Sequence, residues 1–566
     1  MRSGARIAVV GGVFVLFAGG VGYGALSALE GGDGGGTEPK SAAVTKSSGP
    51  PSAEEIRTTA DGFLAAWASG EAARAARLTD NAAEAEPLLS SFRDGAHVSG
   101  VTMKQGKPVG PKVPFTVSAT VSYKGASKPW TYASELTVVR GLTTGRPLVD
   151  WAPSVVHPQL VKGARLKTGP TAEPPIRAVD RRGRELTKEK YPSLGPVLDQ
   201  LRQRYGDEAG GKPGVELVIS RPDGTDGTGS TGSTGSTNGT GSSNGTGSTG
   251  STDSTVLTLA EGEPGELVTT LDADVQAAAE QAVKRHSEAS VVAIRPSTGE
   301  IRAVANNRED GFNAALGGQQ APGSTMKIAT AALLLDKGLV AADRKAECPK
   351  YAMYQGRTFH NLDHFDIPDG TFTRSFARSC NTAFIKLIDD VGDDAALSRL
   401  ARDAFGIGLD WSTGVPTFDG SVPEGSGGEA AAQYIGQGTI QMNALTVASM
   451  TATAKNGGFR QPVIVPRSLD GRELATANRQ LSGSVWRQLR DMMRATAQWG
   501  SGAQAMAGVP GDKGAKTGSA EVDGQATSNS WFAGFAGDLA AAAVVQAGGH
   551  GGDAAGPLVA SVLRSG

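Results

Sequence analysis

Cysteine and histidine are scarce in this chain of 566 residues, which contains two cysteines and six histidines. So few thiols exclude a disulfide-stapled scaffold and a cysteine-rich metal domain. A disulfide between Cys348 and Cys380 and two buried free thiols both remain open. His360 and His364 stand four residues apart, which suits a metal only on a helix, whereas nearby Pro368 indicates a loop. We therefore expect surface or packing histidines and no metal site.

An excess of charge of one sign is also missing, because the formal net charge is −2. This balance gives no reason to expect a nucleic-acid partner. The acidic cluster of Asp389, Asp390, Asp393 and Asp394 is interpreted as a solvated helix end rather than a cation site. The length exceeds what one core supports, so we expect two or three globular units joined by linkers.

The N-terminus carries the chain's long uncharged run, residues 7–29, with Arg2 and Arg6 before it and Glu30 and Asp33 after it. About 20 helical residues cross a hydrocarbon core of about 30 Å. The charge bias predicts a single-pass membrane anchor in contact with lipid, a cytoplasmic tail at 1–6, and the bulk of the chain outside the cell membrane. A cleaved signal peptide is the competing interpretation.

Composition and periodicity then divide the chain. Residues 30–52 are rich in Gly, Ser, Pro and Thr and predict a flexible stalk. A small α+β domain is expected at 53–158, because helical periodicity is followed by alternating apolar residues in two half-buried strands. The helix should bury Ile56, Ala60, Phe63, Leu64 and Trp67, and the strands lie around Phe115–Tyr123 and Trp130–Val138.

A second region, residues 159–266, contains two predicted strands at Val215–Ser220 and Val256–Ala260. Between them, residues 224–254 are almost purely Gly, Ser and Thr. Such a tract cannot bury apolar surface, so the insert is predicted to be disordered.

The third unit, residues 267–566, has strand patterns at both ends and Ala-rich helical stretches between them. We therefore predict an α+β fold in which an antiparallel sheet built from both ends of the unit is flanked by helices. The expected strands are a pair within Val291–Val304 and three more at Ala515–Val522, Trp531–Ala536 and Ala541–Val545.

The first motif with chemical content is Ala321-Pro-Gly-Ser324-Thr-Met-Lys327, which is expected to open a helix that Gly338 ends. Ser324 and Lys327 are three residues apart and should share a helix face. A neutral lysine amine within hydrogen-bond reach can remove the proton from a serine hydroxyl. Taken alone, the pair could equally be a capping serine and a surface lysine.

Two later motifs are weaker by themselves. Ser379-Cys380-Asn381 could be no more than a helix cap. Lys516-Thr517-Gly518 lies in a predicted strand and could be an ordinary solvent-facing edge.

In order and spacing, the three motifs resemble the set found in penicillin-recognising serine enzymes. Three further segments are similar to that family: Val268–Gln276, Tyr434–Gly438 and Trp531–Phe535. Upstream, Arg177–Leu186 resembles the pedestal or dimerisation region of class B penicillin-binding proteins, which are monofunctional transpeptidases. The first unit resembles the nuclear-transport-factor-like domain that some of them carry. No room for a glycosyltransferase domain is apparent.

The resemblance implies roles for the first two motifs. Ser324 would attack the carbonyl between two terminal D-alanines of a peptidoglycan stem peptide, with Lys327 as the general base. Ser379 would relay a proton to the leaving amine, and Asn381 would hold Lys327 and the substrate backbone.

The same resemblance implies substrate binding at the third motif. Lys516 and Thr517 would bind the substrate carboxylate, and the absence of a side chain at Gly518 would let the substrate backbone lie against the strand. The backbone N–H groups of Ser324 and Ser519 would form the oxyanion hole.

The resemblance thus implies a D,D-transpeptidase that cross-links stem peptides, is acylated by β-lactams and needs no metal or organic cofactor. A polytopic glycan polymerase and proteins of cell division or elongation are the implied protein partners. Two rival functions remain: a membrane-anchored β-lactamase, and a non-catalytic β-lactam sensor or division scaffold.

Overall fold

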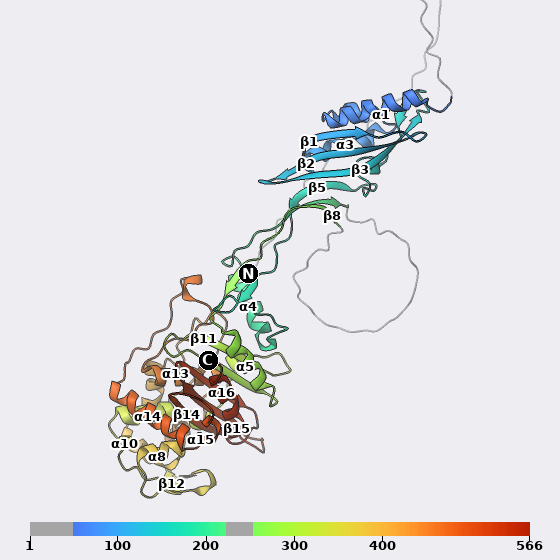
Figure 1. Ribbon diagram of the computed structural model, residues 1–566. Helices are drawn as coiled ribbons and strands as arrows, with labels where there is room; N and C mark the ends of the chain where they lie inside the picture. Colours follow the sequence, from blue (N-terminus) through green and yellow to red (C-terminus); the bar gives the residue numbers. More distant parts are fainter. Residues whose placement is uncertain (1–48, 222–252) are drawn as a thin grey trace, which may run out of the picture.

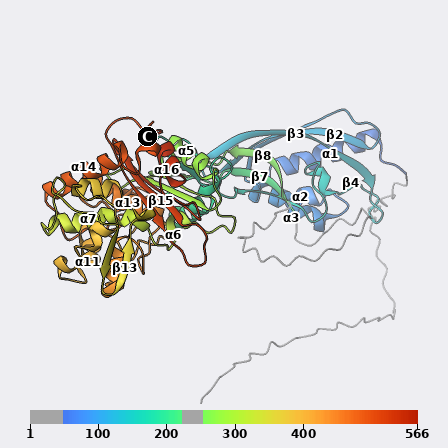
Figure 2. The same ribbon diagram turned by 90° about the horizontal axis from the view of Figure 1, so that it is seen from below.

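The computed structural model describes residues 49–221 and 253–566. The molecule is elongated, with an N-terminal lobe and a larger C-terminal lobe joined by extended chain segments (Figures 1 and 2). The predicted anchor at 7–29, nearly all of the stalk and most of the insert lie outside the described residues. Within the described ranges, no helix has the length and apolar character needed to cross a membrane.

The N-terminal lobe is a curved antiparallel sheet in the order β1-β2-β3-β4, with three helices packed on it (Figure 1). The predicted helix and the predicted strand alternation are confirmed: Phe63 and Trp67 are buried on α1, and every second residue of β2 from Val113 to Val121 is buried. The elements are α1 (Ala53–Ala68), α2 (Ala72–Ala76), α3 (Ala82–Asp94), β1 (Val98–Gln105), β2 (Lys112–Tyr123), β3 (Ala126–Arg140), β4 (Pro147–Val149) and the 3₁₀ turn η1 (Pro153–Val155).

Residues 159–266 divide between the two lobes. Strands β5 (Arg165–Pro170), β7 (Val215–Ser220) and β8 (Ser254–Ala260) form a three-stranded sheet whose buried residues join the N-terminal core. The strand pair β6 (Arg177–Val179) and β9 (Glu266–Val268) instead joins the C-terminal core, as do η2 (Pro192–Leu194) and α4 (Gly195–Tyr205). The last residue of the predicted insert, Ser254, begins β8.

The C-terminal lobe is built on a five-stranded antiparallel sheet in the order β11-β10-β16-β15-β14, so strands from both ends of the unit pair as predicted. Helices α5 (Ala273–Val283) and α16 (Ala555–Leu563) cover one face, and α13 (Ala444–Asn456) and α14 (Gly483–Gln498) cover the other (Figure 1). Helix α7 (Lys327–Asp336) packs on α13 and α14. The strands are β10 (Ala289–Ile294), β11 (Ile301–Asn306), β14 (Lys513–Ala520), β15 (Asn529–Ala536) and β16 (Leu539–Val545). The α+β fold class is therefore confirmed.

Several strand boundaries differ from the predicted ones by a few residues, and β14 is a case in which both ends differ. We expected a strand at Ala515–Val522, but β14 begins at Lys513 and ends at Ala520. The pairing with β15 ends at Ala520, and Val522 lies beyond it with 37% of its surface exposed. The predicted strand ended too late because Val522, an apolar residue just after the strand, continued the apolar pattern.

Helices on both faces of the sheet and beside it make up the rest of the C-terminal lobe, together with a small hairpin of β12 and β13. The helices are α5 (Ala273–Val283), α6 (Ala314–Gly317), α7 (Lys327–Asp336), α8 (Phe372–Ala377), α9 (Thr382–Ile385), α10 (Ile388–Val391), α11 (Ala396–Phe405), α12 (Gly427–Tyr434), α13 (Ala444–Asn456), α14 (Gly483–Gln498), α15 (Ala503–Met506) and α16 (Ala555–Leu563). The hairpin strands are β12 (Tyr351–Tyr354) and β13 (Arg357–His360), and the 3₁₀ turns are η3 (Gly323–Met326), η4 (Leu362–His364) and η5 (Arg467–Leu469).

The two cysteines and the pair His360 and His364 lie in the part of the C-terminal lobe between β11 and β14. Cys348 and Cys380 form a disulfide with their Cα atoms 6.2 Å apart, which answers the question that the sequence left open. His360 ends β13 and His364 ends η4, so the two histidines share no helix, although their rings lie 4.4 Å apart. In the described residues, no group of three or more potential ligands could hold a metal ion. The acidic cluster surrounds the end of α10, with Asp389 and Asp390 exposed.

Candidate active site

The site begins at the turn that carries the predicted nucleophile. Ser324 lies in η3, and Lys327 is the first residue of α7, so a 3₁₀ turn rather than an α-helical turn joins them. The three-residue spacing still places both side chains on one face, and Lys327 Nζ lies 2.9 Å from Ser324 Oγ. Every residue of α7 from Lys327 to Leu335 is buried, so the helix delivers an amine into the protein interior.

Lys327 is fully buried. Its Nζ donates hydrogen bonds to the Ser379 carbonyl at 3.0 Å and to Asn381 Oδ1 at 2.6 Å. Burial, and secondly the nearby Lys516 ammonium, hold the pKa of Lys327 well below its usual value of 10.5. No ion pair in the described chain joins a carboxylate to either lysine. The geometry therefore favours a neutral amine that can accept the proton of Ser324.

The second motif lies in the turn between α8 and α9. Ser379 has a φ of +60°, an unusual conformation for a residue with a side chain and one that collects at functional sites. Asn381 occupies the N-cap position of α9, yet its side chain does not cap that helix. It is directed instead to Lys327, which rules out the simple helix cap considered for this motif.

The third motif lies on β14, which is the edge strand of the sheet beside η3. Lys516 is fully buried, and its Nζ donates to Ser379 Oγ and to the Thr517 carbonyl, both at 2.8 Å. Burial lowers the pKa of Lys516 from 10.5 to about 7. The Ser379 residue thus contacts both lysines, through its carbonyl on one side and its hydroxyl on the other.

The rest of the third motif also meets the nucleophile turn. A Cβ atom added at Gly518 would lie 3.0 Å from the Pro322 carbonyl oxygen, so the strand packs tightly on this turn. The Ser519 carbonyl faces Gly323, where an added Cβ would approach it to 2.5 Å. The Thr517 hydroxyl lies 2.6 Å from the Ser501 hydroxyl.

The segment Tyr434–Gly438, picked out by resemblance alone, supports the nucleophile turn from the other side. The Gly323 N–H donates to the Gly436 carbonyl at 2.9 Å. Gly436 has a φ of +82°, and a Cβ atom there would lie 1.8 Å from the Gly323 carbonyl oxygen. Only glycine fits this position, because both the backbone conformation and the space exclude a side chain.

The structure therefore brings all eight predicted site residues to one place, with hydrogen bonds that link Ser324, Lys327, Ser379, Asn381 and Lys516. Sequence reasoning missed Ser501 as the partner of Thr517 and Asn361 as a partner of the second motif. No motif contains either residue.

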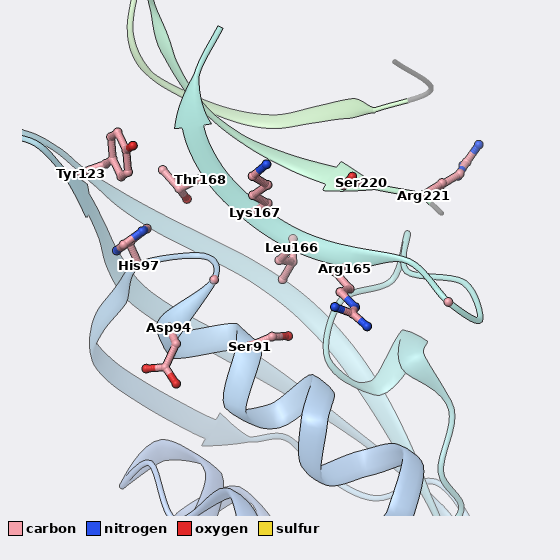
Figure 3. Close-up of a pocket in the computed structure, with 12 residues that line it drawn as sticks. Ser91, Asp94, His97, Tyr123, Arg165, Leu166, Lys167, Thr168, Ser220 and Arg221 are labelled. Atoms are coloured by element: carbon pink, nitrogen blue, oxygen red, sulfur yellow. The ribbon is translucent and has the colours of Figure 1, made fainter. Parts of the chain in front are cut away.

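A separate cavity of about 770 Å³ lies in the N-terminal lobe, between the end of α3 and strand β5 (Figure 3). Arg165, Lys167 and Arg221 give it a basic rim, with Asp94 and His97 opposite. It contains no serine–lysine pair like that of the C-terminal site, so we assign the chemistry to the C-terminal lobe.

A half-buried serine beside a buried lysine, a second buried lysine on an edge strand and the α+β fold together define a serine acyl-transfer enzyme of the penicillin-recognising class. Comparison with known families agrees. Residues 289–564 match the penicillin binding protein transpeptidase domain, and residues 55–164 match the NTF2-like N-terminal transpeptidase domain. The chain belongs to the penicillin-binding protein transpeptidase family.

Two mycobacterial proteins are similar in sequence to this chain. Peptidoglycan D,D-transpeptidase PbpA of Mycolicibacterium smegmatis is 30% identical over 367 residues, which cover 53% of this chain and 73% of that protein. Penicillin-binding protein PbpB of Mycobacterium tuberculosis is 28% identical over 291 residues, which cover 45% of this chain and 42% of PbpB. The match thus spans less than half of PbpB.

The fold is shared with solved structures. Pseudomonas aeruginosa PBP2 in complex with WCK 5153 aligns with a TM-score of 0.50 and 21% identity, over 69% of this chain and 96% of that chain. A chain from a peptidoglycan synthase complex aligns with a TM-score of 0.53 and 20% identity, over 71% of this chain and 92% of that chain.

Proposed function

We propose that this chain is a peptidoglycan D,D-transpeptidase that works through an acyl-enzyme on Ser324 and is acylated by β-lactams. The observation that carries the proposal is the contact of 2.9 Å between Lys327 Nζ and Ser324 Oγ. A base must lie within hydrogen-bond reach of the proton that it removes, and this amine does so while burial holds its pKa well below the usual value.

Acylation follows from these contacts. Neutral Lys327 takes the proton of Ser324 as Oγ attacks the penultimate D-alanine carbonyl. The carbonyl oxygen becomes an oxyanion, which the N–H groups of Ser324 and Ser519 stabilise. The C–N bond then breaks, and the proton that Lys327 took passes by way of the Ser379 hydroxyl to the leaving amine of the terminal D-alanine, which returns Lys327 to its neutral form. The Ser379 hydroxyl lies 2.8 Å from Lys516.

Binding of the donor peptide is assigned to the edge strand. Protonated Lys516 and the Thr517 hydroxyl hold the terminal carboxylate, an interaction of roughly 1.5–3 kcal/mol. Release of D-alanine leaves an ester on Ser324. The amine of a second stem peptide then attacks this ester and loses its proton to Lys327. The bond between the acyl carbon and Ser324 Oγ breaks, Lys327 returns the proton to Oγ, and the new amide bond is the cross-link.

The rival β-lactamase function requires rapid deacylation by water, which usually needs a second base. Among the described residues, no hydrogen bond joins a carboxylate to Ser324, Lys327, Ser379, Asn381 or Lys516. This arrangement favours a long-lived acyl-enzyme. The complete set of chemical groups likewise disfavours a purely scaffolding role.

The test is covalent labelling of the full chain, purified in detergent, with a fluorescent penicillin. We expect one label on the wild-type protein, slow release of that label, and no labelling of Ser324→Ala. Thr325→Ser serves as the matched control, since it changes the neighbouring hydroxyl side chain and leaves the nucleophile in place. Undiminished labelling of Ser324→Ala would refute the assignment of the nucleophile, and release within seconds would favour the β-lactamase.

The location and partners extend the proposal. We place residues 7–29 in the cell membrane with 1–6 in the cytoplasm and the catalytic lobe outside, on the basis of the charge bias around the uncharged run. A polytopic glycan polymerase is the expected partner, and division or elongation complexes are the expected setting, because cross-linking acts on newly made glycan. Protease accessibility of the C-terminal lobe in spheroplasts tests the orientation, and co-purification tests the partner.

A further inference from the structure

The second motif is held by groups that lie outside all three motifs. The main one is Asn361, which follows β13 and has a fully buried side chain. Its Oδ1 accepts hydrogen bonds from the backbone N–H of Asn381 at 2.8 Å and of Thr382 at 3.2 Å. A buried amide that satisfies two backbone donors fixes the position of the turn that carries them.

The other end of the Asn361 amide fixes Asn361 itself. Its Nδ2 donates to the carbonyl of Pro349 at 3.0 Å and to the carbonyl of Phe365 at 2.8 Å, and lies 3.2 Å from Cys348 Sγ. These bonds use both amide hydrogens, so only one orientation of the side chain satisfies every group. Asn361 therefore has no freedom to turn away from the second motif.

The residue before Asn361 sets the orientation of the Asn381 side chain. Asn381 Nδ2 donates to the His360 carbonyl at 3.0 Å, which leaves Oδ1 facing Lys327 at 2.6 Å. If the amide were reversed, its NH₂ group would face the lysine amine and its oxygen would face a carbonyl. The His360 carbonyl therefore decides that Asn381 presents an acceptor to the base.

A covalent link joins the same two segments. Cys380, between Ser379 and Asn381, is bonded to Cys348, which lies just before β12. The backbone of Cys348 in turn pairs with Ile367, beyond the hairpin. The turn that carries the second motif is thus tied to the hairpin segment by one disulfide and by the Asn361 amide.

We infer that Asn361 is a positioning residue for the acylation step, which together with the Cys348–Cys380 disulfide holds Ser379 and Asn381 against Lys327. The inference rests on the proposed function. It concerns chiefly the chemical step, because among the described residues Lys516 and Thr517, which are carried by β14, make no hydrogen bond with Asn361 and meet the second motif only through the Ser379 hydroxyl.

The matched control is Asn443, another fully buried asparagine of the same lobe. Its Nδ2 donates to two carbonyls, those of Leu316 and Phe418, and its Oδ1 accepts from the Thr446 N–H at the start of α13. It makes no hydrogen bond with a motif residue. Asn443→Ala should therefore reproduce the general loss of stability and leave the chemical step unchanged.

The experiment measures the acylation of full-length wild type, Asn361→Ala and Asn443→Ala by a fluorescent penicillin, per folded molecule. Saturation kinetics separate the rate constant of acylation from the dissociation constant of the initial complex. For Asn361→Ala we expect the rate constant to fall at least tenfold and the dissociation constant to change less than threefold. Asn443→Ala should keep both within twofold.

Two results would overturn the inference while the proposed function stands. One is an unchanged acylation rate constant in folded Asn361→Ala, and the other is an equal fall in both variants. If Asn361→Ala does not fold, Asn361→Asp takes its place, since it keeps the acceptor for the two N–H groups and loses the donors. Wild-type protein that is not acylated at all would defeat the proposed function and this inference together.

Discussion

The two lobes bury different kinds of side chain. Between Ala53 and Ala164, the buried polar groups of the N-terminal lobe are threonine, serine and one histidine, and burial lowers the pKa of that histidine, His157. The C-terminal lobe buries Lys327 and Lys516 completely, without a carboxylate partner for either among the described residues. A buried amine must either lose its proton or remain charged without an opposite charge, and both cost free energy of folding. The C-terminal lobe is therefore destabilised by groups that its chemistry needs, whereas between Ala53 and Ala164 the N-terminal lobe buries no such group.

The largest expected effect comes from removing one of the buried amines. Lys327→Met should lower the acylation rate by about 10²–10⁴-fold, the usual contribution of a general base. It should also raise Tm by about 2–6 °C, because an apolar side chain replaces a desolvated amine. Stopped-flow labelling and calorimetry check the two effects. A lower Tm would mean that Lys327 stabilises the C-terminal lobe. That result would contradict the difference in stability inferred between the two lobes.

The N-terminal lobe should respond in the opposite way. Trp67 is buried and packs edge-on against Phe92 and Phe115, with ring centroids 5.1 and 6.1 Å away. Trp67→Ala should cost about 3–5 kcal/mol in the unfolding of this lobe. Acylation of the molecules that stay folded should be unchanged. A proportionate loss of acylation would show that the N-terminal core contributes directly to the catalytic site.

Loss of the disulfide should have an intermediate effect. A sequence separation of 32 residues between Cys348 and Cys380 corresponds to about 3–4 kcal/mol of stabilisation through restriction of the unfolded chain. Cys348→Ser with Cys380→Ser should therefore lower the midpoint of denaturant unfolding of the C-terminal lobe and slow acylation. An unchanged midpoint would contradict this estimate. Treatment of the wild type with a reductant gives an independent comparison.

The smallest expected effect is a dependence on pH. Since the pKa of Lys516 is about 7, its positive charge is present below that pH and is lost above it. Acylation by a penicillin with a free carboxylate should fall above pH 7, by up to tenfold per pH unit in the second-order rate constant. The methyl ester of the same penicillin should not show this decrease. A parallel decrease for the ester would remove Lys516 from carboxylate binding.

The sequence predicted the architecture of each lobe because burial follows simple periodicities in α1, β2 and the five-stranded sheet. It also identified the residues of the three motifs, since their order is characteristic of the family. It could not predict Asn361 or Ser501, because the partners of these polar side chains come from distant segments. Nor could it decide the pairing of the two cysteines, which depends on the path of the chain between them.

The most direct test of the transpeptidase function is the transfer reaction itself. The full-length chain would be incubated with a thioester that mimics the D-Ala-D-Ala donor and with a D-amino acid acceptor, and products would be followed by mass spectrometry. We predict a product in which the acceptor has replaced the leaving group, and no such product from Ser324→Ala. Hydrolysis of the donor without incorporation of the acceptor would contradict the transpeptidase function and indicate a hydrolase.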